Sequence, residues 1–356
     1  MTVRLLIIAW FAILHVGAAT AAPLFASSDP LVVRIEAPMR QLIEDRMAKP
    51  DLPAVVIYED GEGQPVRVAA EISSRGNARL EACDFPPIKL DFDGVDTTGT
   101  VFEGQGELKL VTQCTRGKAP ESWVHQEFGI YRAYNLLTDA SFKVRWLDIT
   151  YQDDSFRNWN RDGPAFVIES VDAAAARLGR VVLHPPEIRP EQFDIPETAT
   201  NILFQYLIGN TDFAVKRGPS GENCCHNGRV VALAGAQQGW IVLPYDFDQA
   251  GIINTEYAAP DSRLPLRGVT ERLYRGFCWH NDASPEAVER FNQLREGITA
   301  ALIPEDISRT RKRRVRRYVD GFYDIINDRG ELQAELLDQC RGDGSFSVRK
   351  TTTAGQ

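Results

Sequence analysis

The sequence has no excess of basic residues, and after its first 22 residues it has no long hydrophobic run. Its 40 Lys and Arg residues stand against 49 Asp and Glu residues, so the formal net charge is -9. Non-specific binding to a polyanion such as duplex DNA is therefore not expected, and we predict no nucleic acid among its partners. The sequence also lacks internal repeats and low-complexity tracts, and 44% of its 356 residues are hydrophobic. This composition excludes a disordered or collagen-like chain and is typical of an ordinary folded protein.

The N-terminal residues have the composition of a secretory signal peptide. Arg4 precedes the apolar run Leu5 to Val16, and small residues then include Ala19-Thr20-Ala21, which offers a cleavage site. The apolar run has about a dozen residues, whereas a membrane-spanning helix needs roughly 20. We therefore expect residues 1–22 to be a cleaved signal peptide and the protein to be exported, either periplasmic or secreted. An uncleaved anchor is the alternative, and we expect no integral membrane span after signal cleavage.

The cysteines indicate disulfide bonds rather than a metal site. All six lie after the expected signal peptide, at Cys83, Cys114, Cys224, Cys225, Cys278 and Cys340. An even number of cysteines in an oxidising compartment favours disulfides. We expect Cys83 to pair with Cys114, and Cys278 to pair with one of the other three. Zinc is disfavoured because Cys224-Cys225-His226 lacks the two-residue gap that lets neighbouring ligands share one tetrahedral ion.

The hydrophobic pattern changes from strand-like to helical along the chain, which predicts an α+β protein. Alternation predicts strands at residues 65–72, 87–92, 106–111, 144–151 and 165–168, and helical spacing predicts helices at 121–138, 198–208, from 284 onward and 306–326. The four prolines within residues 181–196 mark a boundary. We therefore expect a β-rich part at 23–180, a mainly helical part at 181–345 and a flexible tail at 346–356. The basic run at 309–317 is predicted to be an exposed helix face, and the alternative is a dock for an acidic substrate.

Polar residues that can carry chemistry gather between residues 210 and 248. The apolar helix ends at Gly209, so the turn that follows can present Asp212 rigidly. Asn227 comes fifteen residues later, and a short apolar strand leads into Asp246-Phe247-Asp248. Two carboxylates at positions i and i+2 of a strand share one side, so Asp246 and Asp248 can meet the same cation.

These side chains suit phosphoryl transfer. Magnesium takes carboxylate and amide oxygens, commonly only one or two protein carboxylates together with the phosphates of the substrate. In this interpretation Asp212 orients and deprotonates an acceptor hydroxyl, while Asn227 and Asp246 hold the metal. The simpler alternative is that Asp212 lies in a capped turn and that Asp246 and Asp248 form a solvated strand end.

Five short motifs follow one another along the chain. They are Ile72 to Asn77 with Pro87 to Phe92, Leu108-Lys109-Leu110, Phe166 to Glu169, Asn210-Thr211-Asp212, and His226-Asn227 with Pro244 to Asp248. In this order they resemble the Arg-Gly-Asn loop and following strand, the nucleotide-binding lysine strand, the linker strand, and the catalytic and metal motifs of the spore-coat CotH kinase family. The resemblance covers roughly residues 65 to 260. It implies a two-lobed atypical protein-kinase-like fold, with a β-rich N-lobe and a helical C-lobe, that uses ATP and Mg²⁺ to phosphorylate protein hydroxyls.

The resemblance assigns a role to each matching residue. Arg75, Gly76 and Asn77 would form a loop near the phosphates, Lys109 would neutralise the phosphates, and Glu169 would lie near the adenine or pair with a lysine. Asp212 and Lys109 would be catalytic, Asn227 and Asp246 would hold the metal, and Asp248 would support that metal or hold a second one. Lys89 has an equivalent alternation on its strand, so the sequence leaves open which lysine faces the phosphates. His226 is interpreted as structural.

Two departures from the family pattern leave other functions open. The loop reads Arg-Gly-Asn-Ala-Arg where hydroxyl residues often follow in the relatives, and an export signal places the protein where ATP is scarce. The predicted function is an exported CotH-like phosphotransferase that acts on a nucleotide and on a protein or another hydroxyl-bearing acceptor. The alternatives are a catalytically inactive kinase-like binding or envelope-structural protein and a metal-dependent phosphoesterase. The sequence makes no prediction of oligomeric state.

Overall fold

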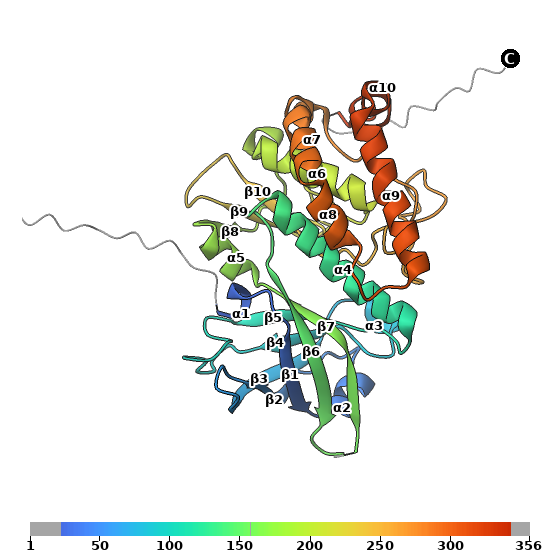
Figure 1. Ribbon diagram of the computed structural model, residues 1–356. Helices are drawn as coiled ribbons and strands as arrows, with labels where there is room; N and C mark the ends of the chain where they lie inside the picture. The colour runs from blue at the N-terminus through green and yellow to red at the C-terminus, as the bar shows by residue number, and fades with distance from the viewer. Residues whose placement is uncertain (1–22, 157, 343–356) are drawn as a thin grey trace, which may run out of the picture.

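The computed structural model describes residues 23–156 and 158–342. The expected signal peptide at 1–22 and the expected tail at 346–356 lie outside these residues. The chain up to Ile168 forms a closed barrel of seven strands, which occupies the lower half of Figure 1, and most of the helices lie above it. The barrel strands are β1 (Leu31–Ala37), β2 (Leu52–Glu59), β3 (Pro65–Ser74), β4 (Ile88–Asp91), β5 (Glu107–Thr112), β6 (Val144–Asp153) and β7 (Asn160–Ile168).

The barrel closes through one parallel pair of strands. The strand order is β1-β2-β3-β4-β5-β7-β6, and β6 then pairs in parallel with β1, with Leu31 opposite Leu147 and Ala37 opposite Asp153. The other neighbouring strands run antiparallel. Side chains alternate across each strand, so one set fills the barrel and forms a hydrophobic core of its own.

The closed barrel corrects the expected fold. A two-lobed protein-kinase-like fold is wrong for this chain, because the β-rich part is a closed, mixed seven-stranded barrel accompanied by helices. Hydrophobic alternation predicted five of the seven strands but missed β1 and β2. Without these two strands the sheet has free edges, whereas β1 joins β2 to β6 and completes the circle. Alternation reveals which residues share a face of a strand, but it does not reveal which strands are neighbours.

A second, smaller sheet lies beyond the barrel. It has the order β10-β9-β8 and consists of β8 (Val181–Leu183), β9 (Gly228–Ala232) and β10 (Ile241–Pro244). The larger helices are α4 (Lys118–Leu137), α5 (Val171–Arg177), α6 (Ile195–Ile208), α7 (Ser284–Gln293), α8 (Arg295–Leu302) and α9 (Arg309–Asn327). The shorter ones are α1 (Pro23–Ala26), α2 (Met39–Glu44), α3 (Ala78–Ala82), η1 (Pro190–Gln192), η2 (Cys278–Ala283), α10 (Arg329–Glu331) and η3 (Leu332–Leu337). The barrel strands end before the division expected at residue 180, which stays a prediction.

Helix α4 links the barrel to the helical part. It follows β5 in the sequence, yet it packs against α8 as well as β7, and in Figure 1 it runs between the barrel and the upper helices. Its buried Tyr131 contacts both Phe166 of β7 and Phe247 beyond β10, at ring-centroid distances of 5.7 and 4.8 Å. One hydrophobic core therefore runs from the outer side of the barrel through α4 into α6 and α9.

The basic run lies on α9, with its apolar stripe turned inward. Val315, Val319 and Phe322 are fully buried. Arg314 turns back and donates to the carbonyls of Ile252 and Ile253 at 3.1 and 2.8 Å. Part of the basic run therefore fixes a neighbouring loop, rather than all of it facing solvent.

Three disulfide bonds are present. Cys83 pairs with Cys114, as expected, and Cys278 pairs with Cys340. The adjacent residues Cys224 and Cys225 are joined to one another. Within residues 23–156 and 158–342, none of the helices has the length and apolar character needed to cross a bilayer.

Candidate functional site

The turn after α6 presents Asp212. Gly209 ends the helix in the left-handed region, with φ 64°. A Cβ atom at this position would collide with the hydroxyl of Tyr318, so the close approach and the positive φ both require glycine. The side-chain carbonyl of Asn210 then accepts the backbone N–H of Asp212 at 2.9 Å. The tight helix end at Gly209 and the hydrogen bond from Asp212 to Asn210 therefore hold the backbone that carries the Asp212 carboxylate.

The small sheet brings the other polar residues beside this turn. Gly228, the first residue of β9, pairs with Pro244, the last residue of β10. The residues that precede β9 consequently lie next to those that follow β10. The backbone N–H of Tyr245 donates to the carbonyl of Asn227 at 3.1 Å. Asn227 and Asp246 thus come from segments far apart in sequence but meet at one end of the sheet.

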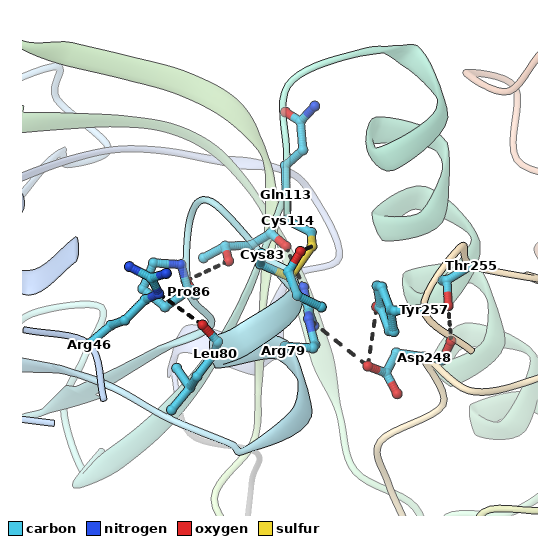
Figure 2. The surroundings of a disulfide bond; sticks show 12 residues. Arg46, Arg79, Leu80, Cys83, Pro86, Gln113, Cys114, Asp248, Thr255 and Tyr257 are labelled. Atoms are coloured by element: carbon cyan, nitrogen blue, oxygen red, sulfur yellow. Dashed lines mark hydrogen bonds and ion pairs between the residues drawn. A yellow bond between two sulfur atoms is a disulfide. The ribbon is translucent and has the colours of Figure 1, made fainter. Parts of the chain in front are cut away.

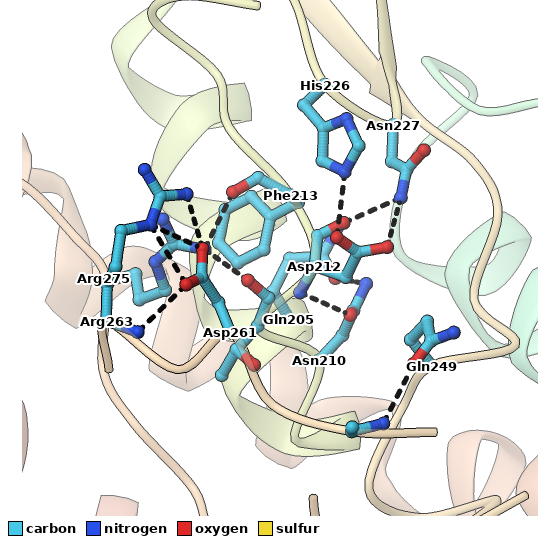
Figure 3. A network of polar contacts seen from close by, with 12 residues as sticks. Gln205, Asn210, Asp212, Phe213, His226, Asn227, Gln249, Asp261, Arg263 and Arg275 are labelled. Atoms are coloured by element: carbon cyan, nitrogen blue, oxygen red, sulfur yellow. Dashed lines mark hydrogen bonds and ion pairs between the residues drawn. The ribbon is translucent and has the colours of Figure 1, made fainter. Parts of the chain in front are cut away.

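Both oxygens of the Asp212 carboxylate are held in place, as Figure 3 shows. The Nε2 atom of His226 lies 2.8 Å from Oδ1 of Asp212. The Nδ2 atom of Asn227 donates to Oδ2 at 2.9 Å and to the backbone carbonyl of Asp212 at 2.7 Å. The hydrogen bond to Asp212 raises the pKa of His226. Because the side chain of Asp212 is still 43% exposed, it is both oriented and accessible.

A cavity of about 730 Å³, here called the central cavity, collects most of the predicted site residues. Its lining includes Arg75, Gly76, Asn77, Lys109, Asp212, Asn227, Asp246 and Asp248. The barrel supplies the first four of these and the segments around the small sheet supply the others. Residues predicted to act together therefore face one hollow between the two parts of the chain.

Lys109 faces the central cavity from the outer side of β5. Its neighbours Leu108 and Leu110 are fully buried inside the barrel, so the lysine points the other way. Its Nζ lies 4.1 Å from the centroid of the Tyr245 ring, and the guanidinium of Arg229 lies 4.6 Å from the same centroid. Burial lowers the pKa of Lys109 to about 7, and the nearby charges of Arg229 and then Arg75 contribute to this decrease.

Lys89 lies directly opposite Lys109 in the β4–β5 pair but has carboxylate partners. Its Nζ lies 3.2 Å from Asp51 and 3.5 Å from Asp91. It is absent from the lining of the central cavity, whereas Lys109 is part of it. Of the two lysines that the sequence could not separate, Lys109 is thus the one beside the candidate metal residues.

Asp246 and Asn227 present oxygen atoms that suit a hard cation. Both residues have positive φ, 63° for Asp246 and 51° for Asn227, which is uncommon outside glycine. The backbone N–H of Asp246 donates to the hydroxyl of Tyr131 at 2.9 Å. Within the described part of the chain, the Asp246 carboxylate makes no hydrogen bond or ion pair of its own. The Nδ2 atom of Asn227 donates its hydrogen bonds to Asp212. The Oδ1 atom of Asn227 is therefore the atom that can accept a bond from, or coordinate, another ligand.

Asp248 lies deeper than Asp246 and has protein partners. Its Oδ2 accepts a hydrogen bond from the hydroxyl of Tyr257 at 3.2 Å and lies 4.0 Å from Nε of Arg79 (Figure 2). Burial raises the pKa of Asp248 to about 7, and the neighbouring charge of Asp246 adds to the rise. This environment suits a residue that supports Asp246 better than one that binds a cation directly.

The donor set has one free carboxylate, one amide oxygen and a deeper carboxylate. Among residues 23–156 and 158–342 there is no group of three or more His, Cys, Asp or Glu side chains placed to hold a metal ion. A metal ion that needs three or more such side chains as ligands does not fit these residues. Magnesium fits, because it commonly uses one or two carboxylates and completes its shell with water and substrate phosphates.

The predicted adenine residue lies apart from this group. Glu169 lines a neighbouring cavity of about 700 Å³, here called the Glu169 cavity, which shares Glu107, Lys109 and Arg229 with the central cavity. The Glu169 carboxylate accepts two hydrogen bonds from Arg177, at 2.8 and 3.0 Å. Its charged partner is therefore an arginine.

Sequence reasoning missed Arg79, Glu127 and Arg229. Arg79 follows the predicted loop by two residues, and Arg229 follows Asn227 by two residues as the second residue of β9, so both lay next to recognised motifs. Glu127 lies on the buried face of α4, where a carboxylate among apolar residues is unusual. Burial raises its pKa to about 8, with Asp248 as the next cause. A charged residue within the helical apolar stripe was the signal that could have revealed it.

Neither a scan against models of known protein families nor a search among curated proteins finds a match for this chain.

Proposed function

We propose that this protein is an exported, magnesium-dependent phosphotransferase that moves the terminal phosphate of ATP to a hydroxyl group of a protein or another acceptor. The proposal agrees with the resemblance of the motifs to the CotH kinase family, although the fold that this resemblance implied is wrong. The observation that carries it is the shared central cavity, which Lys109 lines from the barrel and Asp212 and Asp246 line from the other side.

The charges of the central cavity favour a metal-bound polyphosphate. Arg75, Lys109 and Arg229 contribute positive charge, and Gly76, with φ 80°, leaves open space around its Cα for a close approach. Asp246 and Asn227 would hold magnesium, which would supply charge neutralisation at the phosphate oxygens. Because the pKa of Lys109 is lowered to about 7, we expect this lysine to gain a proton when phosphates enter.

We propose that the Glu169 cavity receives the nucleoside of ATP. It joins the central cavity at Lys109 and Arg229, so a nucleotide with its phosphates in the central cavity can extend its base toward Glu169. A phosphoesterase needs neither a phosphate-binding lysine nor a second cavity beside it. For this reason we favour a transferase over a hydrolase.

Asp212 is the residue proposed to act on the acceptor. The contacts from His226 and Asn227 fix its carboxylate, so it can orient the hydroxyl and take up its proton. The new bond forms between the acceptor oxygen and the terminal phosphorus as the bond from that phosphorus to the bridging oxygen of ATP breaks. The transferred proton ends on Asp212.

Export is supported by the covalent structure. Three disulfide bonds, one of them within the barrel part and one within the helical part, favour an oxidising compartment. The proposed location is the periplasm or the exterior of the cell. The donor must then be supplied outside the cytoplasm.

The decisive experiment compares the mature protein with Asp246→Asn and Asp212→Asn after incubation with labelled ATP and magnesium. Label on protein or added acceptor should disappear in both variants. ATP with magnesium should raise the thermal stability of the wild type, by about 2.7 kcal/mol at a concentration 100 times Kd. This stabilisation should be lost in Asp246→Asn and retained in Asp212→Asn, because Asp246 is proposed to hold the metal and Asp212 is not.

Asp320→Asn is the matched control, because this half-exposed carboxylate of α9 pairs with Arg295 at 3.2 Å and lines neither the central cavity nor the Glu169 cavity. It should label as the wild type does. Equal labelling of all variants would refute the assigned roles. Cleavage of phosphate esters without use of ATP would identify a phosphoesterase, and absence of both nucleotide binding and cleavage would identify a binding or structural protein.

A further inference from the structure

A third cavity adjoins the central cavity at the proposed catalytic carboxylate. It has a volume of about 560 Å³ and is here called the Arg275 cavity. It shares Asp212, Pro219, His226 and Gln249 with the central cavity. In Figure 3, Asp212 lies between the pair His226 and Asn227 and a group that includes Asp261, Arg263 and Arg275. A molecule in the Arg275 cavity can therefore reach the same carboxylate as a phosphate in the central cavity.

Arginine side chains outnumber carboxylates in the lining of this cavity. Arg217, Arg263 and Arg275 line it, whereas its carboxylates are Asp212, already assigned to the transfer step, and Asp261. The excess of positive charge is local, because the whole chain has a formal net charge of -9. Electrostatic complementarity therefore favours an acidic ligand here.

Two of these arginines lie at the rim. The side chains of Arg217 and Arg263 are 69% and 86% exposed. Arg217 pairs with Glu187 at 2.7 Å, and Arg263 pairs with Asp261. Because a guanidinium has five N–H donors, one carboxylate partner leaves further donors for a ligand.

Arg275 forms the inner wall beside Asp212. Its Nη1 donates to the carbonyls of Thr211 and Phe213, the residues on either side of Asp212, at 2.8 Å in the case of Phe213. Within the described part of the chain, no carboxylate forms an ion pair with Arg275, and its Nε is buried without a hydrogen-bond partner. Arg275 thus lines the cavity without a direct ion-pair partner among the described residues, and only the charges of Asp212 and Asp261, which line the same cavity, oppose its own through space.

We infer that the Arg275 cavity binds the acceptor, and that this acceptor is a peptide segment in which acidic residues flank the reacting Ser or Thr hydroxyl. The inference rests on the proposed function, since it assigns a substrate class to the same site. The hydroxyl meets Asp212 at the junction of the two cavities, while the flanking carboxylates meet the rim arginines. The exposed positions of Arg217 and Arg263 suit an extended chain that continues beyond the cavity.

The first test measures peptide binding without nucleotide. Two fluorescent peptides with a central serine, identical except for Glu or Lys at the flanking positions, are titrated with the wild type and with the double variant Arg217→Gln, Arg263→Gln, and fluorescence anisotropy is recorded. The wild type should bind the Glu peptide more tightly than the Lys peptide. Each arginine removed should weaken Glu-peptide binding by about two- to five-fold, as expected for exposed ion pairs.

Asp261→Asn gives a change of opposite sign. It removes the carboxylate partner of Arg263, so it should strengthen binding of the Glu peptide and leave binding of the Lys peptide weak. Equal binding of the two peptides by the wild type, or a preference that survives unchanged in the double variant, would overturn the inference.

A second test separates this inference from the proposed function. Stabilisation of the wild type by ATP with magnesium reports on the donor site alone, and phosphate transfer to each peptide reports on both sites together. If ATP binds and label enters the Lys peptide as readily as the Glu peptide, the acceptor inference fails and the phosphotransferase stands. If ATP does not bind, the proposed function fails, and peptide binding still decides whether the cavity selects acidic segments.

Discussion

Replacing Lys109 with methionine should stabilise the ligand-free protein, and the gain should depend on pH. Burial and the charges of Arg229 and Arg75 lower the pKa of Lys109 from 10.5 to about 7. A positively charged Lys109 is therefore a cost to the folded state, which the site bears in order to receive an anion. Methionine has a similar length and no charge, so it removes this cost.

The pH dependence of stability follows from the number of protons that the folded and the unfolded chain bind. Between pH 7 and 10.5 the unfolded chain carries a proton on Lys109 that the folded chain does not, so the stability of the wild type rises with pH across this window. At 1.36 kcal/mol per pKa unit, Lys109 lowers the free energy of unfolding by about 5 kcal/mol at pH 6 and by about 2 kcal/mol at pH 9. The advantage of the methionine variant should accordingly shrink by up to about 3 kcal/mol between these pH values. This is an upper figure, because water in the open cavity screens the charge.

Urea denaturation of both proteins at several pH values between 6 and 9 measures this difference directly. Lys89→Met is the matched control. Burial lowers the pKa of Lys89, but its hydrogen bond to Asp51 and the charges of Asp51, Glu107 and Asp91 together raise it, so removal of Lys89 should destabilise the protein instead. Lys109→Met should also lose the stabilisation by ATP with magnesium. A difference between Lys109→Met and the wild type that does not change with pH would refute the assignment of Lys109 to a desolvated, cationic site.

Three further predictions concern the frame around the site. Replacing both Cys83 and Cys114 with serine opens a loop with a sequence separation of 31 and should lower the free energy of unfolding, measured with urea, by about 3 to 4 kcal/mol. A decrease below about 1 kcal/mol would contradict this expectation. Gly209→Ala should lower the melting temperature through its positive φ, and a melting temperature equal to that of the wild type would show that the turn tolerates a side chain. The pKa of His226 is raised by its bond to Asp212, so His226→Asn should destabilise the protein at pH 5 to 6, with an effect that fades as pH rises through the folded pKa. A loss of equal size at pH 9 would indicate that packing, not the charged pair, is what the variant removes.

Much of the local structure could be predicted from the sequence, because hydrophobic period and termination signals act over short distances. The helix expected at 198–208 is α6 at Ile195–Ile208, and the strand expected at 106–111 is β5 at Glu107–Thr112. Helix α9, expected at 306–326, spans Arg309–Asn327. The disulfide between Cys83 and Cys114 was also predicted, from the order of the cysteines alone.

Arrangement in space was harder to predict. Closure of the barrel depends on a parallel pair between residues 31–37 and 147–153, and no local pattern states that these segments are neighbours. For the same reason, the resemblance placed Glu169 either near the adenine or beside a lysine, whereas Arg177 at the end of α5 holds its carboxylate. The buried charges Glu127 and Arg79 were missed because their burial arises from packing between α4, α3 and the loop beyond β10.

The parallel pairing of β1 with β6 has a consequence for how an exported chain would fold. Strand β1 emerges early, yet the strand that covers its second edge lies more than 100 residues later in the sequence. Until that strand arrives, β1 presents unsatisfied backbone groups that can pair with another molecule. We expect a chain exported as proposed to need protection from aggregation during this interval, after which the completed barrel has no edge left to protect.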